Sequence, residues 1–394
     1  MTRVKSHLKQ INNTFFIFLF LLITANTIYC QNYSVYKSKI DTAFVSTRLG
    51  YEKKISVLLP NDWQKNNPKQ YPLIIIFDQQ NKRSHNQIIN TIDYLTASEQ
   101  MPRAIIISIE SDNSRRISEA KSPKSSTSGK AHLNEKFLFE EVIALAESKY
   151  KANSFRLLIG HSWYGHFTTA MFTKYSDSLS AVIALDPFFN QKNVSLMDSI
   201  SALKTHNIIH TKYYRYAIGK DYPEDYASIK TAEKQFKNSK IDIKGTYFPR
   251  AFHHAVPGLG IAEALYDIFE YWSIEQFAFF EPLNSSIDVF FQSKQNVKNH
   301  YGTNLDFSLG ILNGKGWFFY NNNDYKNAIE AWELLLLSYP NFSEGYLYIM
   351  DAQMVLNQDI TDTIERFNAS LANSQFYSEK EKNDLIKELE SLKK

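Results

Sequence analysis

The segment around Ser162 constrains the fold most strongly, because it joins two kinds of secondary structure through a very tight turn. Residues 155–159 are an apolar run typical of a buried strand, and residues 163–174 have the pattern of a helix. Gly160-His161-Ser162 stands between them. A serine on a sharp strand-to-helix turn is the arrangement of the nucleophile elbow, which exposes the hydroxyl above a sheet. The pattern therefore predicts a nucleophilic serine; an ordinary strand–helix turn is the alternative.

Similar apolar runs recur along the chain and alternate with helical segments. They predict strands at residues 55–59, 73–77, 104–109, 181–185, 213–218 and 241–248, with a leading strand within 31–50. Helical spacing marks residues 88–95, 135–150 and 258–271. Strands that alternate with helices imply a mostly parallel sheet with right-handed crossovers. We therefore expect an α/β fold whose functional residues follow the carboxyl ends of strands.

A serine hydroxyl is a poor nucleophile at neutral pH and needs a base to take its proton. Histidine is the side chain suited to that role. His253 and His254 come late in the chain, in a loop between a predicted strand and a predicted helix. A surface or capping histidine is the alternative for either one. Together with the elbow, this position favours His253 as the base, ahead of His254.

The base in turn needs a carboxylate to hold its tautomer and stabilise the imidazolium. Asp221 follows the predicted strand 213–218 and is the first candidate, and Glu224 in the same loop is the alternative. Asp186 also ends a predicted strand, but the Asp186-Pro187 pair is interpreted as a turn cap. The order along the chain is then serine, acid, histidine.

Backbone N–H groups near the serine would stabilise the oxyanion of the reaction. We expect these donors at Trp163, directly after the serine, and at Gln79, in the loop after residue 77. His161 and Trp163 flank the serine and are predicted to line the cleft, although core packing is an equal alternative for Trp163. Residues 111–130 are long and polar, which fits either an active-site loop or a surface loop.

Four blocks of the sequence carry a resemblance to a known family. They are residues 72–78, residues 101–109, the Gly160-His161-Ser162 elbow and residues 253–257. In their spacing the chain resembles the putative esterase family of α/β-hydrolases, which includes esterase D and the ferric-enterobactin esterases. The resemblance runs over roughly residues 40–275. It implies an α/β-hydrolase fold and a serine esterase that forms an acyl-enzyme.

The resemblance also bears on individual residues. Its late H-x-x-x-P pattern implies His253 as the base, with Pro257 four residues later. Its oxyanion donor corresponds to Gln79, where the family usually has glycine. Its elbow has a glycine where this chain has Tyr164, so Tyr164 is expected either to narrow the substrate cleft or to shift the elbow.

An arginine-containing loop of the family is similar to residues 113–116. This similarity places Arg115 and Arg116 beside the cleft. The aspartate that usually follows in the family is missing from this chain.

The last ninety residues have a different, helical pattern. Gly316, Phe319, Ala328, Trp332 and Pro340 stand at the offsets of a tetratricopeptide unit. A second unit is weaker. We therefore expect a hydrolase domain at residues 31–290 and a tetratricopeptide-like helical domain at residues 300–394. That second domain would be either a structural appendage or a groove that binds a protein partner.

The first thirty residues have the pattern of an export signal. Arg3, Lys5 and Lys9 precede an apolar run over residues 15–25, which is short for a membrane span. Cleavage after Cys30 would leave an exported chain, periplasmic or secreted, without cysteine. A lipid anchor on Cys30 and an uncleaved membrane anchor are the alternatives.

Charge and motifs narrow the function. The chain has 44 basic and 41 acidic residues, and three of the basic ones lie in the predicted signal, so the remainder is balanced. This balance argues against a nucleic-acid binder.

With no H-x-H or H-E-x-x-H motif, and with adjacent histidines that would diverge on an extended chain, we expect neither metal nor cofactor. The prediction is an exported serine esterase acting on a small-molecule ester. The alternative is an inactive hydrolase-like envelope protein that binds a partner through its helices.

Overall fold

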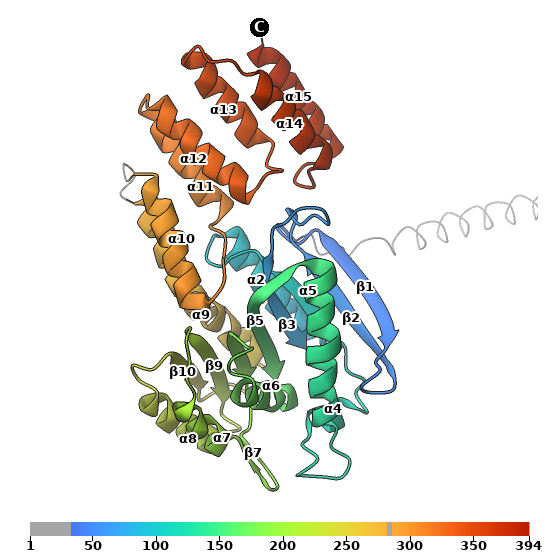
Figure 1. Ribbon diagram of the computed structural model, residues 1–394. Helices are drawn as coiled ribbons and strands as arrows, with labels where there is room; N and C mark the ends of the chain where they lie inside the picture. The colour runs from blue at the N-terminus through green and yellow to red at the C-terminus, as the bar shows by residue number, and fades with distance from the viewer. Residues whose placement is uncertain (1–32, 282–285, 394) are drawn as a thin grey trace, which may run out of the picture. The chain divides into compact units, whose positions relative to one another are not determined.

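The computed structural model describes residues 33–281 and 286–393, and an eight-stranded sheet lies at its centre (Figure 1). The strand order is β1-β2-β4-β3-β5-β6-β9-β10. The strands are β1 (Ser38–Val45), β2 (Glu52–Leu59), β3 (Tyr71–Phe77), β4 (Ile105–Ile109), β5 (Ala152–His161), β6 (Ala181–Leu185), β9 (Lys212–Gly219) and β10 (Ile241–Phe248). A small separate hairpin is formed by β7 (Asn190–Gln191) and β8 (Val194–Ser195).

The sheet is mostly parallel, as predicted. Only β1 with β2 and β2 with β4 pair antiparallel, and every other neighbouring pair in this sheet is parallel. Each predicted strand is present. Strands β3, β4 and β6 are buried along their whole length, as expected for largely apolar runs covered on both faces. The carboxyl ends of β3, β5, β6, β9 and β10 therefore lie at one edge.

Helices cover the sheet on its two faces. On one face, Phe167 of α6 (Trp163–Lys174) joins the core formed by alternate residues of β3, such as Leu73 and Ile75. The long helix α9 (Val256–Phe280) lies against β6, β9 and α2 (Lys82–Ala97). The remaining helices of this part are α3 (Arg116–Ala120), α4 (Ala131–Lys136), η1 (Phe137–Ile143), α5 (Ala144–Tyr150), α7 (Leu196–Ala202), η2 (Leu203–Thr205) and α8 (Pro223–Gln235).

The chain from residue 286 to residue 393 contains helices joined by loops, and no strand. Its helices are α10 (Asp288–Tyr301), α11 (Leu309–Asn321), α12 (Tyr325–Ser338), α13 (Glu344–Val355), α14 (Thr361–Asn373) and α15 (Glu379–Leu392). From α11 to α14 each helix packs against the next. Gly316 lies directly against the Trp332 indole, where a side chain would not fit. The all-helical segment is confirmed, whereas its tetratricopeptide identity and the domain boundaries stay predictions.

Lys69 connects the loop before β3 to this helical segment. Its ammonium lies 2.7 Å from Asp62 and 3.5 Å from Asp306, and it donates to the Ser338 carbonyl at 2.8 Å. Burial alone would lower the pKa of Lys69, but the two carboxylates raise it above its ordinary value. The ammonium therefore stays charged at neutral pH and links the two parts.

The predicted signal peptide and Cys30 lie outside the described residues. Within the part of the chain that is described, no helix is both long and apolar enough to cross a membrane.

Candidate active site

Ser162 lies at the point where β5 ends and α6 begins. Its backbone has φ 60° and ψ −117°, a conformation that costs an L-residue free energy and is concentrated at functional sites. The Ser162 N–H donates to the Leu185 carbonyl at 2.9 Å, which ties the turn to the end of β6. A Cβ at Gly160 would collide with the backbone carbonyl of Tyr164, so only glycine permits this close approach. These features are those of a nucleophile elbow.

Tyr164 belongs to the core, which corrects its predicted place in the substrate cleft. It is fully buried, and its ring stacks on Phe77 with the centroids 4.6 Å apart. Its hydroxyl donates to Glu119 at 2.7 Å and lies 2.5 Å from Ser111 Oγ. On the first turn of α6 the side chain at this position is directed towards the sheet, so a large residue replaces the family's glycine without crowding the serine.

Glu119 is the charged centre beneath the elbow. Its carboxylate pairs with Lys53 at 2.9 Å and accepts a hydrogen bond from Tyr51 at 2.7 Å. Burial by itself would raise the pKa of Glu119. The Lys53 ammonium and the hydroxyl donors together lower it by more than burial raises it, so the pKa lies below its ordinary value. The predicted loop 111–130 is therefore not loose at this point: α3, which lies in it, is anchored to the elbow by a buried ionised group.

His253 lies in the turn between β10 and α9, and its ring meets an acid. Its Nδ1 lies 2.5 Å from Asp186 Oδ2. Asp186 follows β6 and is fully buried, and its Oδ1 accepts the Gly219 N–H at 2.6 Å. A carboxylate held in this way sets the tautomer of the imidazole and leaves Nε2 free for proton transfer.

The two predicted acids are displaced by this arrangement. Asp221 accepts a hydrogen bond from the backbone N–H of His253 at 2.9 Å and does not meet the ring. Glu224 lies exposed in the first turn of α8. The prediction of Asp221, with Glu224 as alternative, was therefore wrong about the partner of the histidine ring. The signal that pointed to Asp186 was its position directly after a fully buried strand next to β5.

His161 and His254 complete a group of three imidazoles. The rings of His161 and His253 lie with their centroids 4.5 Å apart, and those of His253 and His254 lie 5.2 Å apart. Potential ligand atoms of all three lie within 4.8 Å of one another. The expectation that His253 and His254 diverge was wrong, because they lie in a turn and not on an extended strand.

The two predicted oxyanion donors differ in availability. The Trp163 N–H is at the first position of α6 and has no acceptor among the described residues. The Gln79 N–H donates to the Ile109 carbonyl at 3.0 Å, so it is not free to meet an oxyanion. Its prediction as a donor is therefore contradicted. The Gln79 side chain is also engaged, since its amide donates to Ser56 Oγ.

Arg116 and Arg115 have internal partners. Arg116 Nε donates to both oxygens of Asp78 at 2.8 Å, and its Nη2 donates to the His161 carbonyl at 3.2 Å. It thus braces the ends of β3 and β5 against each other. The Arg115 guanidinium lies over the Tyr51 ring, 4.3 Å from its centroid. Arg116 thus contacts the end of the elbow strand and Arg115 packs on Tyr51, while their place beside the cleft stays a prediction.

Ser162 Oγ forms no hydrogen bond in the described part of the chain, and no hydrogen bond joins it to His253. Serine and base are nevertheless brought to the same edge, since His161, adjacent to Ser162, donates from Nε2 to the His253 carbonyl at 3.1 Å. In the absence of substrate, catalytic hydrogen bonds are often long and tighten only in the complex.

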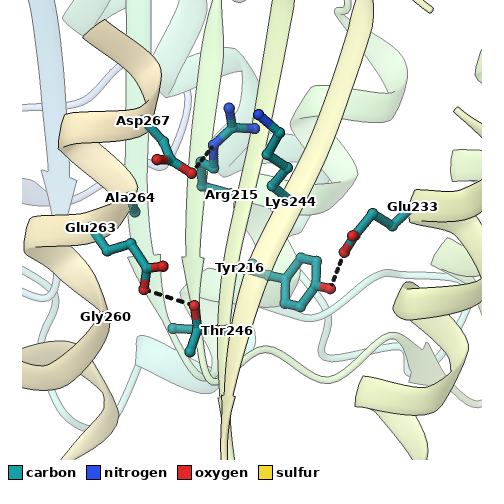
Figure 2. Close-up of a pocket in the computed structure, with 11 residues that line it drawn as sticks. Arg215, Tyr216, Glu233, Lys244, Thr246, Gly260, Glu263, Ala264 and Asp267 are labelled. Atoms are coloured by element: carbon teal, nitrogen blue, oxygen red, sulfur yellow. Dashed lines mark hydrogen bonds and ion pairs between the residues drawn. The ribbon is translucent and has the colours of Figure 1, made fainter. Parts of the chain in front are cut away.

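A polar pocket of about 200 Å³ lies between β9, β10 and α9 (Figure 2). Its charged groups are largely paired: Tyr216 donates to Glu233 at 2.6 Å and Thr246 to Glu263 at 2.7 Å. Ser162 and the three histidines do not line it. It therefore makes no contribution to the chemistry of the elbow.

Comparison with known proteins agrees with this fold. Residues 46–229 match the model of a family described as putative esterase. No curated protein matches the chain in sequence. The chain is similar in fold to an IroE-like serine hydrolase from Shewanella oneidensis, with 16% identity, a TM-score of 0.60 and coverage of 76% of this chain and 99% of that one.

Two further solved structures are similar. One is an uncharacterised protein from Capnocytophaga ochracea, at 13% identity, with a TM-score of 0.57 and coverage of 90% of this chain and 100% of that one. This likeness extends into the C-terminal helices. The other is the siderophore hydrolase EstB from Aspergillus nidulans, at 15% identity, with a TM-score of 0.51 and coverage of 60% of this chain and 96% of that one.

Proposed function

We propose that this chain is a member of the putative esterase family and a serine hydrolase of carboxylic esters, in which Ser162, His253 and Asp186 form the catalytic triad. The contact of 2.5 Å between His253 Nδ1 and Asp186 Oδ2, at the edge where the Ser162 elbow lies, carries the proposal. A histidine that acts as a general base needs a carboxylate on its Nδ1, and the fully buried Asp186 is held there.

The reaction follows from the available atoms. Ser162 Oγ bonds to the acyl carbon while its proton passes to His253 Nε2. The tetrahedral intermediate then expels the alcohol, which takes that proton, and the acyl-enzyme remains. Water repeats the sequence: it gives a proton to His253, bonds to the acyl carbon and releases the acid as Ser162 regains its proton.

The negative oxygen of the intermediate needs backbone donors. We assign the first to the Trp163 N–H, which opens α6 and has the helix dipole behind it. The second donor comes from the loop after β3. There the Gln80 N–H has no acceptor among the described residues, whereas the Gln79 N–H is occupied.

The substrate class is a small-molecule ester. One similar structure is a siderophore hydrolase, so a siderophore ester belongs beside aliphatic and sugar esters in a substrate panel. Export of the enzyme, periplasmic or secreted, stays a prediction from the first thirty residues. A protein partner of the C-terminal helices stays a prediction as well.

The test uses the full chain with p-nitrophenyl acetate and a fluorophosphonate probe. Ser162→Ala is expected to lose about 10³-fold or more in kcat/KM and all labelling. Ser228→Ala, on the exposed side of α8, is the matched control and is expected to behave as wild type. Undiminished activity or labelling in Ser162→Ala would place the nucleophile elsewhere.

A further inference from the structure

The three imidazoles at the candidate active site exceed what a triad needs. One histidine is sufficient as a base, yet ligand atoms of His161, His253 and His254 lie within 4.8 Å of one another. They come from the end of β5 and from the turn before α9. The way in which two of them are held indicates what the group can bind.

His161 has a buried ring nitrogen, Nδ1, that carries no proton and has no hydrogen-bond partner among the described residues. Its Nε2 lies 3.1 Å from the His253 carbonyl oxygen, and because a carbonyl only accepts, Nε2 carries the proton. Its Nδ1 therefore has the lone pair. That nitrogen is buried and has no hydrogen-bond partner in the described part of the chain, and the whole side chain is only 5% exposed. An unpartnered buried acceptor calls for an explanation, such as an ion.

His253 is oriented in the manner of a metal ligand. Its Nδ1 faces Asp186, so the lone pair is on Nε2. A histidine that binds a metal usually gives its other ring N–H to a carboxylate or a backbone carbonyl. His253 has the first kind of partner and His161 the second.

His254 supplies the adjustable third ligand. Ligand nitrogens on a tetrahedral ion with bonds of about 2.0–2.1 Å stand about 3.4 Å apart. The ligand atoms of the three histidines lie within 4.8 Å of one another, a limit about 1.4 Å wider than that spacing, so the group closes around the ion when it binds. The His254 side chain is exposed and is the one to adjust, since hydrogen bonds hold the rings of His161 and His253.

We propose that His161, His253 and His254 form a binding site for one divalent transition-metal ion of the zinc type, and that the bound ion inhibits the esterase. Three neutral imidazoles suit zinc and do not suit calcium or magnesium, which prefer oxygen. The ion occupies the lone pair of His253 that would otherwise take the proton of Ser162. The inhibitory part rests on the proposed function, whereas binding does not.

Binding is tested without reference to activity. The full-length Ser162→Ala protein is titrated with zinc chloride by calorimetry, and with cobalt(II) chloride by visible absorption. We expect one ion per chain and the intense d–d bands of a four-coordinate cobalt site. In the Ser162→Ala protein, a second substitution of His254→Asn or His161→Asn is expected to weaken metal binding at least tenfold. His132→Asn, which replaces an exposed histidine of α4, is the matched control and should leave metal binding unchanged. Absent binding, or equal binding in Ser162→Ala and Ser162→Ala/His254→Asn, overturns the site.

Inhibition is tested on the active protein. Zinc chloride is expected to abolish p-nitrophenyl acetate hydrolysis, and EDTA to restore it. Each protein is compared with its own metal-free rate, and His254→Asn is expected to need at least tenfold more zinc than wild type for half-inhibition. Full activity of the zinc-loaded enzyme would overturn the inhibitory role and leave the site. Cobalt binding to a protein with no hydrolytic activity would refute the proposed function alone.

Discussion

The carboxylate of Asp186 faces Nδ1 of His253 at 2.5 Å, although 67 residues separate the two in the chain. Asp186 is fully buried and also accepts the Gly219 N–H, so it cannot turn away from the ring without losing both partners. Asp221, closer in sequence, meets only the backbone of the same histidine. This arrangement distinguishes an orienting acid from a loop contact and can be tested directly.

Exchange of the orienting acid should be far more harmful than exchange of its neighbour. Asp186→Asn is expected to lower kcat for p-nitrophenyl acetate by about 10³–10⁴-fold, because the amide cannot hold the productive tautomer of His253. Asp221→Asn, the matched control, is expected to change kcat by less than about tenfold. A larger loss in Asp221→Asn than in Asp186→Asn would return the catalytic role to Asp221.

The Tyr164 hydroxyl should contribute to stability more than to catalysis. Tyr164→Phe removes a hydrogen bond to the buried carboxylate of Glu119 and is expected to lower the free energy of unfolding by about 1.5–3 kcal/mol. Urea denaturation measures this loss, and kcat of the folded protein should stay within a few-fold of wild type. Tyr226→Phe is the control, since its hydroxyl has no partner among the described residues. Equal stability of the two variants would contradict the proposed role of the network.

Two glycines should respond oppositely to the same substitution. Gly160→Ala places a Cβ against the Tyr164 backbone carbonyl and is expected to destabilise the fold by more than about 4 kcal/mol or to prevent soluble expression. Gly258→Ala, in the first turn of α9, has only a flexible Gln87 atom at 3.9 Å and should be neutral or stabilising by about 0.5–1 kcal/mol. Thermal unfolding distinguishes them. A stable Gly160→Ala protein would show that the elbow has more room than its backbone suggests.

Buried neutral histidines should make the fold sensitive to acid. Burial lowers the pKa of His166 to about 4, below the ordinary 6.5 that it regains on unfolding. The unfolded state therefore binds a proton that the folded state excludes between these two values. For this group, the free energy of unfolding is constant above pH 6.5 and falls by about 1.4 kcal/mol per pH unit from 6.5 to 4.

Urea denaturation at several pH values tests this contribution. The His166→Asn variant is expected to show a slope about 1.4 kcal/mol per pH unit smaller than that of wild type between pH 6 and 4.5. His132→Asn, whose side chain is exposed, should keep the wild-type slope. Identical slopes in all three proteins would mean that His166 is protonated in the folded state.

The local pattern of apolar residues determined most of the fold. The runs that became β3, β4 and β6 are apolar except for Ser108 of β4, and this pattern predicts a covered parallel sheet without knowledge of the neighbours. The elbow could also be predicted from the sequence, because its turn is formed by the consecutive residues Gly160, His161 and Ser162. The family resemblance, confirmed over residues 46–229, depended on the same blocks.

Tertiary structure alone decided which side chains meet. Asp186 and Asp221 both follow strands, and only the pairing of β6 with β9, together with the turn before α9, brings one of them to the His253 ring. Whether a backbone N–H is free depends on its neighbour strand, which is why Gln79 is occupied by Ile109. Spacing along a chain fixes short-range geometry, whereas contacts between strand ends depend on how distant segments pack.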